Sequence, residues 1–119
     1  MDKSRRKELL AEYKNIKTYM GVFQIKNNTN NKIYIGTCPN LKNRWLTQKI
    51  QLEAGRHINA GLQKDWNQCS ANAFTYEVID QKEAGKIIDK KWELKKMERE
   101  WLEKLQPYGN NGYNKPPKD

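Results

Sequence analysis

Two short runs of alternating hydrophobic and polar side chains lie between residues 20 and 36, and such alternation is typical of half-buried β-strands. The runs, residues 20–26 and 32–36, are rich in β-branched and aromatic side chains. The residues between them read Asn-Asn-Thr-Asn-Asn and favour a turn, because asparagine tolerates left-handed φ angles. The pattern predicts a β-hairpin, in which a symmetric turn places Phe23 roughly opposite Tyr34 on one face.

Apolar residues at three- and four-residue spacing predict helices in most of the remaining chain. We expect these helices at residues 2–19, 40–54, 56–69 and 83–105. Pro39 is placed to open the second helix, which puts Arg44 about one turn into it, and Gly55 is placed to close it. Residues 80–83 have the character of a capping box before the last helix, and Pro107 stops that helix.

A third alternating run, residues 74–79, predicts one more strand, so the expected order of elements is α-β-β-α-α-β-α. We therefore predict an α+β fold, a small three-stranded antiparallel sheet flanked by helices with an extra N-terminal helix. A length of 119 residues suits one domain. We assign residues 20–119 to it and residues 1–19 to a helical extension. The basic first turn of that extension is either a phosphate-contacting arm or a solvated face.

The chain is strongly basic, with a formal net charge of +9. Residues 1–19, 20–80 and 81–119 each carry a net charge of +3, so the excess is spread along the chain rather than gathered in a tail. A basic surface on a folded domain favours a polyanionic partner. A basic protein without such a partner remains the alternative at this point.

The cysteine content and the hydropathy of the chain indicate which cellular compartment to expect. The two cysteines, Cys38 and Cys69, supply neither a disulfide framework nor the spacing of metal ligands. We therefore expect free thiols in a reducing, cytoplasmic setting. No apolar run approaches the length of a membrane span, and the N-terminus lacks the apolar core of a signal peptide, so no membrane partner is expected.

One carboxylate interrupts the apolar face of the last predicted helix. That face is formed by Leu94, Trp101, Leu102 and Leu105. At about 100° per residue Glu98 lies near its middle, whereas Glu93 can lie outside it. A carboxylate on a buried face costs several kcal/mol unless it is paired or bound to a cation. The partner of Glu98 is thus either a basic side chain, Lys95 or Arg44, or a metal ion.

The hairpin and several later segments resemble the GIY-YIG nuclease family, and most closely the nuclease domains of phage-type homing endonucleases. The two half-motifs stand here as Gly21-Val22-Phe23 and Tyr34-Ile35-Gly36. The later segments are Leu41-Lys42-Asn43-Arg44-Trp45, Gly55-Arg56-His57, Leu62-Gln63, Glu98 with Trp101-Leu102, and Gly112-Tyr113-Asn114. The resemblance covers nearly the whole chain. It departs from the family at Phe23, where the family has a tyrosine.

The resemblance implies a role for each matching residue. Glu98 matches the single carboxylate that holds a divalent metal, Mg²⁺ or Mn²⁺. Arg44 matches the arginine that binds a non-bridging phosphate oxygen, a task that suits a planar, permanently charged side chain. His57 falls on a catalytic-site histidine that accepts a proton or orients water. Tyr34 points its hydroxyl into the site, and because Phe23 lacks a hydroxyl, only Tyr34 of this pair can activate water.

Supporting residues complete the expected site. Gly36 permits a close approach of backbone or substrate, and Asn114 is expected to bond the site and tie down the C-terminal tail. Three basic residues near the motifs, Lys26, Lys32 and Arg56, are expected to contact nucleic acid. Each position also has a plainer interpretation: Tyr34 as strand packing, His57 as a surface residue and Asn114 as an ordinary loop residue.

The expected function is therefore hydrolysis of phosphodiester bonds in double-stranded DNA with one Mg²⁺ or Mn²⁺ per site, impaired to the extent that Phe23 matters. A non-cleaving DNA-binding module derived from a nuclease is the first alternative. An RNA-binding domain is the second, although no RNA-recognition motif is present. A phage or bacterial origin fits the resemblance. The chain is either free-standing or the excised domain of a larger protein.

Overall fold

The computed structural model describes residues 17–116. Its strands are β1 (Tyr19–Asn27), β2 (Ile33–Cys38) and β3 (Phe74–Glu83), and its helices are α2 (Arg44–Glu53), α3 (Ala60–Gln68) and α4 (Lys90–Leu105). Short 3₁₀ turns occupy Ala71–Ala73, Ala84–Lys86 and Gly109–Asn111. The helix predicted at residues 2–19 lies outside the described residues except at its end, where Tyr19 instead begins β1.

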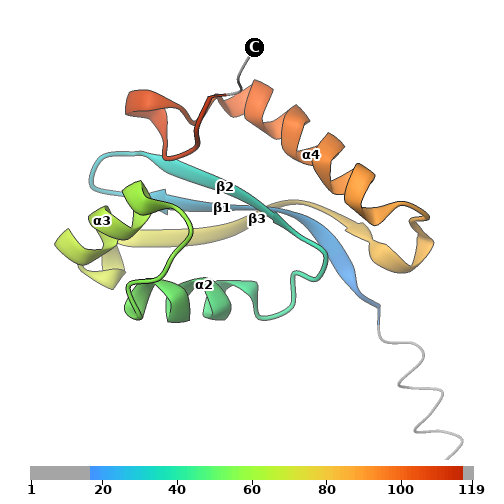
Figure 1. The fold of residues 1–119 in the computed structure, drawn as a ribbon, viewed down its shortest axis with the longest axis horizontal. Helices are drawn as coiled ribbons and strands as arrows, with labels where there is room; N and C mark the ends of the chain where they lie inside the picture. Colours follow the sequence, from blue (N-terminus) through green and yellow to red (C-terminus); the bar gives the residue numbers. More distant parts are fainter. Residues whose placement is uncertain (1–16, 117–119) are drawn as a thin grey trace, which may run out of the picture.

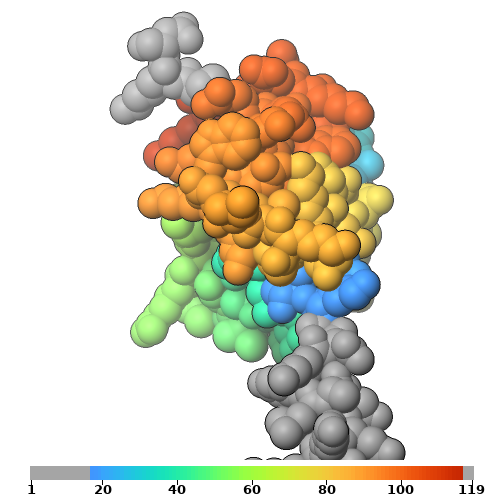
Figure 2. Space-filling view, turned by 90° about the vertical axis from the view of Figure 1, so that its right-hand side faces the viewer, coloured from blue at the N-terminus to red at the C-terminus, as the bar shows by residue number. Residues whose placement is uncertain are grey.

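The three strands form one antiparallel sheet with β1 in the centre, in the order β2-β1-β3. Helix α4 covers one face of the sheet, and α2 and α3 cover the other (Figure 1). The α+β prediction is therefore confirmed. The space-filling view shows the same arrangement from one end, with α4 above, α2 and α3 below, and the end of β3 between them (Figure 2).

A separate hydrophobic cluster fills each side of the sheet. On the α2 and α3 side the buried residues are Phe23, Ile25, Cys38, Leu52, Leu62, Trp66 and Phe74. On the α4 side they are Met20, Val22, Ile35, Ala84 and Met97. Successive residues of β1 thus alternate between two buried faces, which follows from the period-2 geometry of a strand. The central strand β1 therefore contributes side chains to both hydrophobic clusters of the domain.

The register of the hairpin differs from the symmetric prediction. Phe23 pairs with Gly36, and Tyr34 pairs with Ile25, so the strands are offset by two residues from the expected pairing. Asn27 causes the offset, because its backbone N–H donates to the carbonyl of Lys32 (2.9 Å) and extends β1 into the predicted turn. A two-residue offset keeps every side chain on its face. Phe23 and Tyr34 therefore still share the α2 and α3 side.

Two helices begin later than the sequence pattern predicted. Helix α2 begins at Arg44 rather than at residue 40, because Asn43 adopts a left-handed conformation (φ 58°) that breaks helical continuity before it. Arg44 is therefore the first residue of α2, not one turn into it. Helix α3 begins at Ala60 rather than at residue 56, after Asn59 caps it by accepting the Leu62 N–H.

The last helix also differs at its start. Residues 80–83 belong to β3 and do not cap a helix, and α4 begins only at Lys90. The cap is Asp89, whose side chain accepts the Trp92 N–H (3.0 Å). Pairing along the length of β1 holds residues 80–83 in the sheet, and this outweighs their local capping character.

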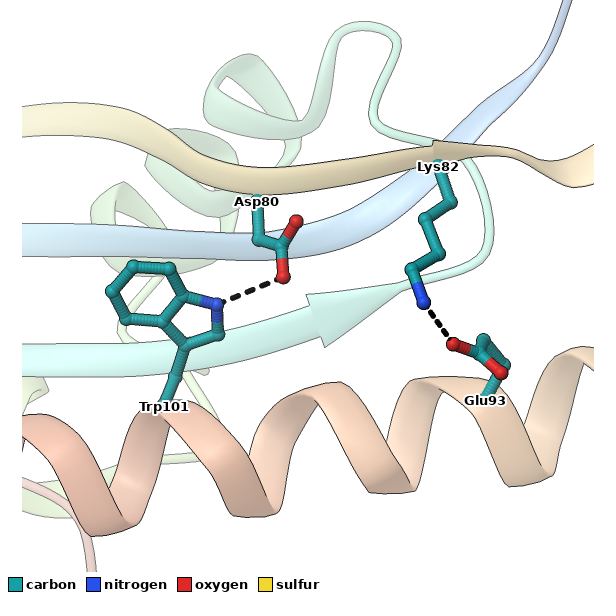
Figure 3. Close-up of polar contacts among 4 residues, drawn as sticks. All are labelled: Asp80, Lys82, Glu93 and Trp101. Atoms are coloured by element: carbon teal, nitrogen blue, oxygen red, sulfur yellow. Dashed lines mark hydrogen bonds and ion pairs between the residues drawn. The ribbon is translucent and has the colours of Figure 1, made fainter.

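Two polar contacts fix α4 against the sheet (Figure 3). The indole of Trp101 donates to the Asp80 carboxylate (2.9 Å), and Lys82 forms an ion pair with Glu93. Glu93 is therefore buried on the sheet side of α4, which corrects the expectation that it could lie outside that face. Because these contacts lie on either side of Glu98 along the helix, they set its position relative to the sheet.

No helix within residues 17–116 is long and apolar enough to cross a membrane.

Candidate active site

Four of the expected site residues gather on the α2 and α3 side of the hairpin. The rings of Phe23 and Tyr34 lie 6.2 Å apart between centroids, and the His57 ring meets the Tyr34 ring edge-on at 5.3 Å. The Arg44 guanidinium lies 5.7 Å from the centre of the Phe23 ring. These residues come from both strands of the hairpin, from the first turn of α2 and from the loop before α3. The fold thus brings together residues up to 34 positions apart (Phe23 and His57).

Arg44 is the charged centre of this side. Its Nε is buried and has no hydrogen-bond partner among residues 17–116. A buried donor without an acceptor costs about 1–3 kcal/mol, so this N–H is available to an oxygen that the described residues do not supply. Burial raises the pKa of the Cys38 thiol above its ordinary value, and the Arg44 charge partly opposes this.

Glu98 approaches β2 from the opposite face. It projects from α4, is half-buried, and accepts a long hydrogen bond from the Thr37 hydroxyl (3.4 Å). Neither Lys95 nor Arg44 forms an ion pair with it, and within the described residues no cluster of three metal-ligating side chains surrounds it. The carboxylate is thus held by one weak neutral donor and retains capacity to accept.

Tyr34 links the two faces at the outer edge of the sheet. Burial raises the pKa of its hydroxyl above the ordinary value of 10.0, the Arg44 charge opposes this, and the Glu98 charge adds to it. Both charges therefore act on the Tyr34 hydroxyl, although one comes from each side of the sheet. This hydroxyl makes no hydrogen bond to any of residues 17–116.

His57 is buried, with 8% of its surface exposed, rather than an ordinary surface residue. Its Nδ1 accepts the backbone N–H of Asn59 (3.0 Å), which places the ring proton on Nε2, and Nε2 donates to the Gln48 side chain (2.6 Å). Both ring nitrogens are therefore engaged. Burial lowers the pKa of His57 below its ordinary value of 6.5, and the Arg44 charge adds to the lowering.

Sequence reasoning missed Gln48. It lies one helical turn after Arg44 and is buried, with 4% of its surface exposed. The sequence placed Gln48 on the side of α2 that carries Arg44 and Leu52, but its burial, which requires a hydrogen-bond partner for the amide, is seen only in the structure.

The neutral state of His57 should make the stability of the domain depend on pH. Because its folded-state pKa lies below 6.5, the unfolded chain binds more protons as the pH falls through that value. The free energy of unfolding should therefore be highest above about pH 7 and should decline as the pH falls below it. Urea unfolding of the protein and of His57→Gln between pH 8 and pH 5.5 tests this. A decline equally steep in His57→Gln would show that other groups cause it.

Gly36 is required by the ring that it faces. A Cβ built on Gly36 would lie 2.4 Å from Cζ of Phe23, too close for any real contact. We predict that Gly36→Ala destabilises the domain by about 1–3 kcal/mol, the usual cost of forcing atoms into a packed core. Urea unfolding measures this, with Gly85→Ala as the control because nothing lies within 4 Å of a Cβ there. Equal stability of the two variants would contradict the prediction.

Asn114 ties the C-terminal tail to the outer edge of β2. Its side-chain oxygen accepts the Ile35 N–H and its amide donates to the Ile35 carbonyl, both at 2.9 Å. The Tyr113 N–H donates to the Ile33 carbonyl (2.9 Å), and Gly112 makes a parallel bridge to the same residue. The tail thus acts as a short fourth strand whose last contacts are made by a side chain.

The three expected nucleic-acid contacts do not form one cluster. Lys32 lies over the Tyr113 ring (5.7 Å), beside the tail. Arg56 is exposed next to His57. Lys26 pairs with Ile33 across the hairpin, and by strand alternation it lies on the α4 side, away from the face of Tyr34.

Known proteins share this architecture. The family model described as the GIY-YIG catalytic domain matches residues 19–114. Intron-associated endonuclease 1 of Enterobacteria phage T4 is 32% identical over 96 residues, which are 79% of this chain and 36% of that protein. The chain thus spans little more than a third of the length of this curated relative.

Two solved structures superpose on the chain. The catalytic domain of the homing endonuclease I-TevI gives a TM-score of 0.66 at 30% identity, covering 82% of this chain and 99% of that one. A glutamate-to-alanine mutant of the I-TevI catalytic domain gives a TM-score of 0.64 at 29% identity, covering 83% of this chain and 93% of that one. The fold of the chain is thus that of the I-TevI catalytic domain. The chain belongs to the GIY-YIG catalytic-domain family.

Proposed function

We propose that the chain cleaves phosphodiester bonds of double-stranded DNA with one Mg²⁺ or Mn²⁺, at the outer edge of β2. The observation that carries this proposal is the buried Arg44 Nε–H, which has no acceptor among residues 17–116 and belongs to a guanidinium beside the Phe23 ring, on the face that also holds the Tyr34 and His57 rings. An arginine and a metal-binding carboxylate on either side of a hydroxyl are the groups that phosphate hydrolysis requires. The basic character of the chain, with its net charge of +9, suits a DNA substrate.

Glu98 fits a hard divalent cation. It is half-buried and its one partner in the described part of the chain is the Thr37 hydroxyl, so its oxygens can accept further bonds. One carboxylate leaves most of an octahedral shell to the substrate phosphate and water, an arrangement that Mg²⁺ commonly adopts. When bound there, the cation would supply Lewis-acid stabilisation of the charge on phosphate.

The protein side chains divide the remaining work. Arg44 would donate its free Nε–H to a non-bridging phosphate oxygen, helped by the N-terminus of α2, which begins at that residue and favours anions. Tyr34, whose phenol is protonated at neutral pH, would hydrogen-bond the attacking water, and the proton of that water would pass through bulk solvent to the leaving oxygen. His57 has no free nitrogen, so we assign it the role of holding the Tyr34 ring rather than of accepting a proton.

The direct experiment is incubation of supercoiled plasmid with the chain and Mg²⁺ or Mn²⁺, with EDTA as the control. Nicked or linear DNA that forms only with the metal supports the proposal. Tight DNA binding without cleavage, in the parent chain and in Phe23→Tyr alike, would favour the alternative of a non-cleaving DNA-binding module. That alternative rests on the missing hydroxyl at Phe23.

We further propose that the catalytic domain runs from the start of β1 to the C-terminal tail, that the residues before β1 are an extension of it, and that the protein works in the cytoplasm. Specific recognition of a DNA sequence is not expected from this domain alone, because no groove-reading motif is present.

DNA binding should therefore depend steeply on salt. Each phosphate contact contributes a slope of about −0.9 in a plot of log K against log salt concentration. We expect affinity for a random duplex to fall at least tenfold between 50 and 200 mM salt, as several contacts imply. Fluorescence anisotropy with metal-free protein measures this. A single duplex bound far more tightly than random sequence at physiological salt would contradict the prediction.

A further inference from the structure

Lys115 lies where two hollows beside the edge of β2 meet. One hollow, of about 470 Å³, is lined by Glu98 and Tyr108. The other, of about 400 Å³, is lined by Tyr34 and Asn59. Lys115 is the one described residue that lines both. It therefore stands between the carboxylate on the α4 side and the hydroxyl on the other side.

The backbone leading to Lys115 is held in place from several directions. Asn114 makes two side-chain hydrogen bonds to Ile35, and its own N–H donates to the Pro107 carbonyl (3.0 Å). The carbonyl of Tyr113 accepts the Asn59 side-chain amide (2.8 Å). The tail is thus joined at once to β2, to the end of α4 and to the start of α3. This anchoring fixes the point from which the Lys115 side chain extends.

The Lys115 ammonium itself is uncommitted. The residue is exposed, and its side chain forms no ion pair or hydrogen bond with any of residues 17–116. An ammonium carries three donors and binds phosphate oxygens as a point charge. A free cation on an anchored backbone between Glu98 and Tyr34 therefore has the charge that a DNA strand crossing this edge requires.

We infer that Lys115 binds a backbone phosphate of the strand to be cut and holds that strand across the edge of β2, between Tyr34 and Glu98. The inference rests on the proposed DNA-cleaving function and adds a substrate contact to it. Arg44 would bind phosphate from the α2 side and Lys115 from the tail side. The hydrogen bonds of Asn114 would then serve to position Lys115 as well as to close the sheet edge.

Two experiments test this inference, and the first does not require cleavage. Lysines of the full chain are acetylated with an amine-reactive ester, with and without a 20-base-pair duplex in metal-free buffer, and the sites are quantified by mass spectrometry. We expect the duplex to slow acetylation of Lys115 several-fold. Lys90 provides the internal control, because it is exposed at the start of α4 and is not part of the proposed site.

The second experiment measures plasmid cleavage by Lys115→Gln, Lys115→Arg and Lys90→Gln, in the Phe23→Tyr background if the parent chain is slow. Loss of one charged contact should slow Lys115→Gln by roughly 10- to 100-fold, whereas Lys115→Arg and Lys90→Gln should keep most of the activity. The inference is overturned if the duplex leaves acetylation of Lys115 unchanged, or if Lys115→Gln cuts as fast as Lys90→Gln. If no variant cuts DNA, the proposed function fails, and the acetylation result alone decides whether Lys115 binds phosphate.

Discussion

Replacing Glu98 by glutamine is expected to abolish metal-dependent cleavage while the domain stays folded. Glutamine keeps the size of the side chain and can still accept the Thr37 hydroxyl hydrogen bond, so the packing of α4 should not change. It removes the negative charge that Glu98 would offer to a divalent cation. Because the cation would supply the largest share of charge stabilisation, we expect activity to fall by at least about 10³-fold, the upper range for a single electrostatic group.

Glu100→Gln is the matched control. Glu100 is an exposed residue of the same helix, so the same chemical change there should leave cleavage intact. Thermal melts of both variants would confirm that neither loses its fold. A fully active Glu98→Gln enzyme would remove Glu98 from the metal site and with it the main support for the proposed mechanism.

Replacing Phe23 by tyrosine is expected to raise cleavage, because a hydroxyl would be restored next to Arg44 and Tyr34. The Phe23 ring has its Cζ over Gly36, and its centre lies 5.7 Å from the Arg44 guanidinium. A hydroxyl on Cζ would thus extend along β2, near an arginine N–H that has no acceptor within the described residues. One positioned acid–base group typically contributes about 10²–10⁴-fold in rate, and we expect a gain in that range.

The stability of Phe23→Tyr should change little, because the ring keeps its packing and the hydroxyl gains a donor. The other phenylalanine of the chain, Phe74, provides the control: Phe74→Tyr adds the same atom away from the site, beside Trp66. Rates of plasmid cleavage and urea unfolding should be compared for all three proteins. If the parent chain already cuts as fast as Phe23→Tyr, the hydroxyl at this position is dispensable.

The strands and the sharing of a face by Phe23 and Tyr34 could be predicted because a period-2 pattern survives small errors in register. The pairing itself could not, because it depends on Asn27, whose side chain accepts two hydrogen bonds from Thr29 and organises a turn later than the symmetric one. Helix α4 was predicted to start seven residues early for a related reason: local capping character at residues 80–83 is weaker than pairing with the central strand.

For the expected site, too, the sequence pattern predicted which residues take part but not their detailed contacts. Motif spacing predicted that Tyr34, Arg44, His57 and Glu98 belong to the site, but it carried no information on their hydrogen bonds. The partner of Glu98 within the described residues is Thr37 on the facing strand β2, rather than Lys95 or Arg44. His57 is held by Gln48 and Asn59, which no pattern of spacing singled out. Such partners are set by tertiary packing and become visible only in the structure.

The most direct test of the account compares Phe23→Tyr with the double variant Phe23→Tyr, Glu98→Gln on supercoiled plasmid in Mg²⁺. The first protein provides the restored hydroxyl, and the second differs only in the proposed metal ligand. We predict that Phe23→Tyr converts the plasmid to nicked and linear forms, that EDTA stops it, and that the double variant leaves the plasmid intact. Equal cleavage by both proteins, or by either protein in EDTA, would contradict a metal-dependent site built on Glu98 at the edge of β2.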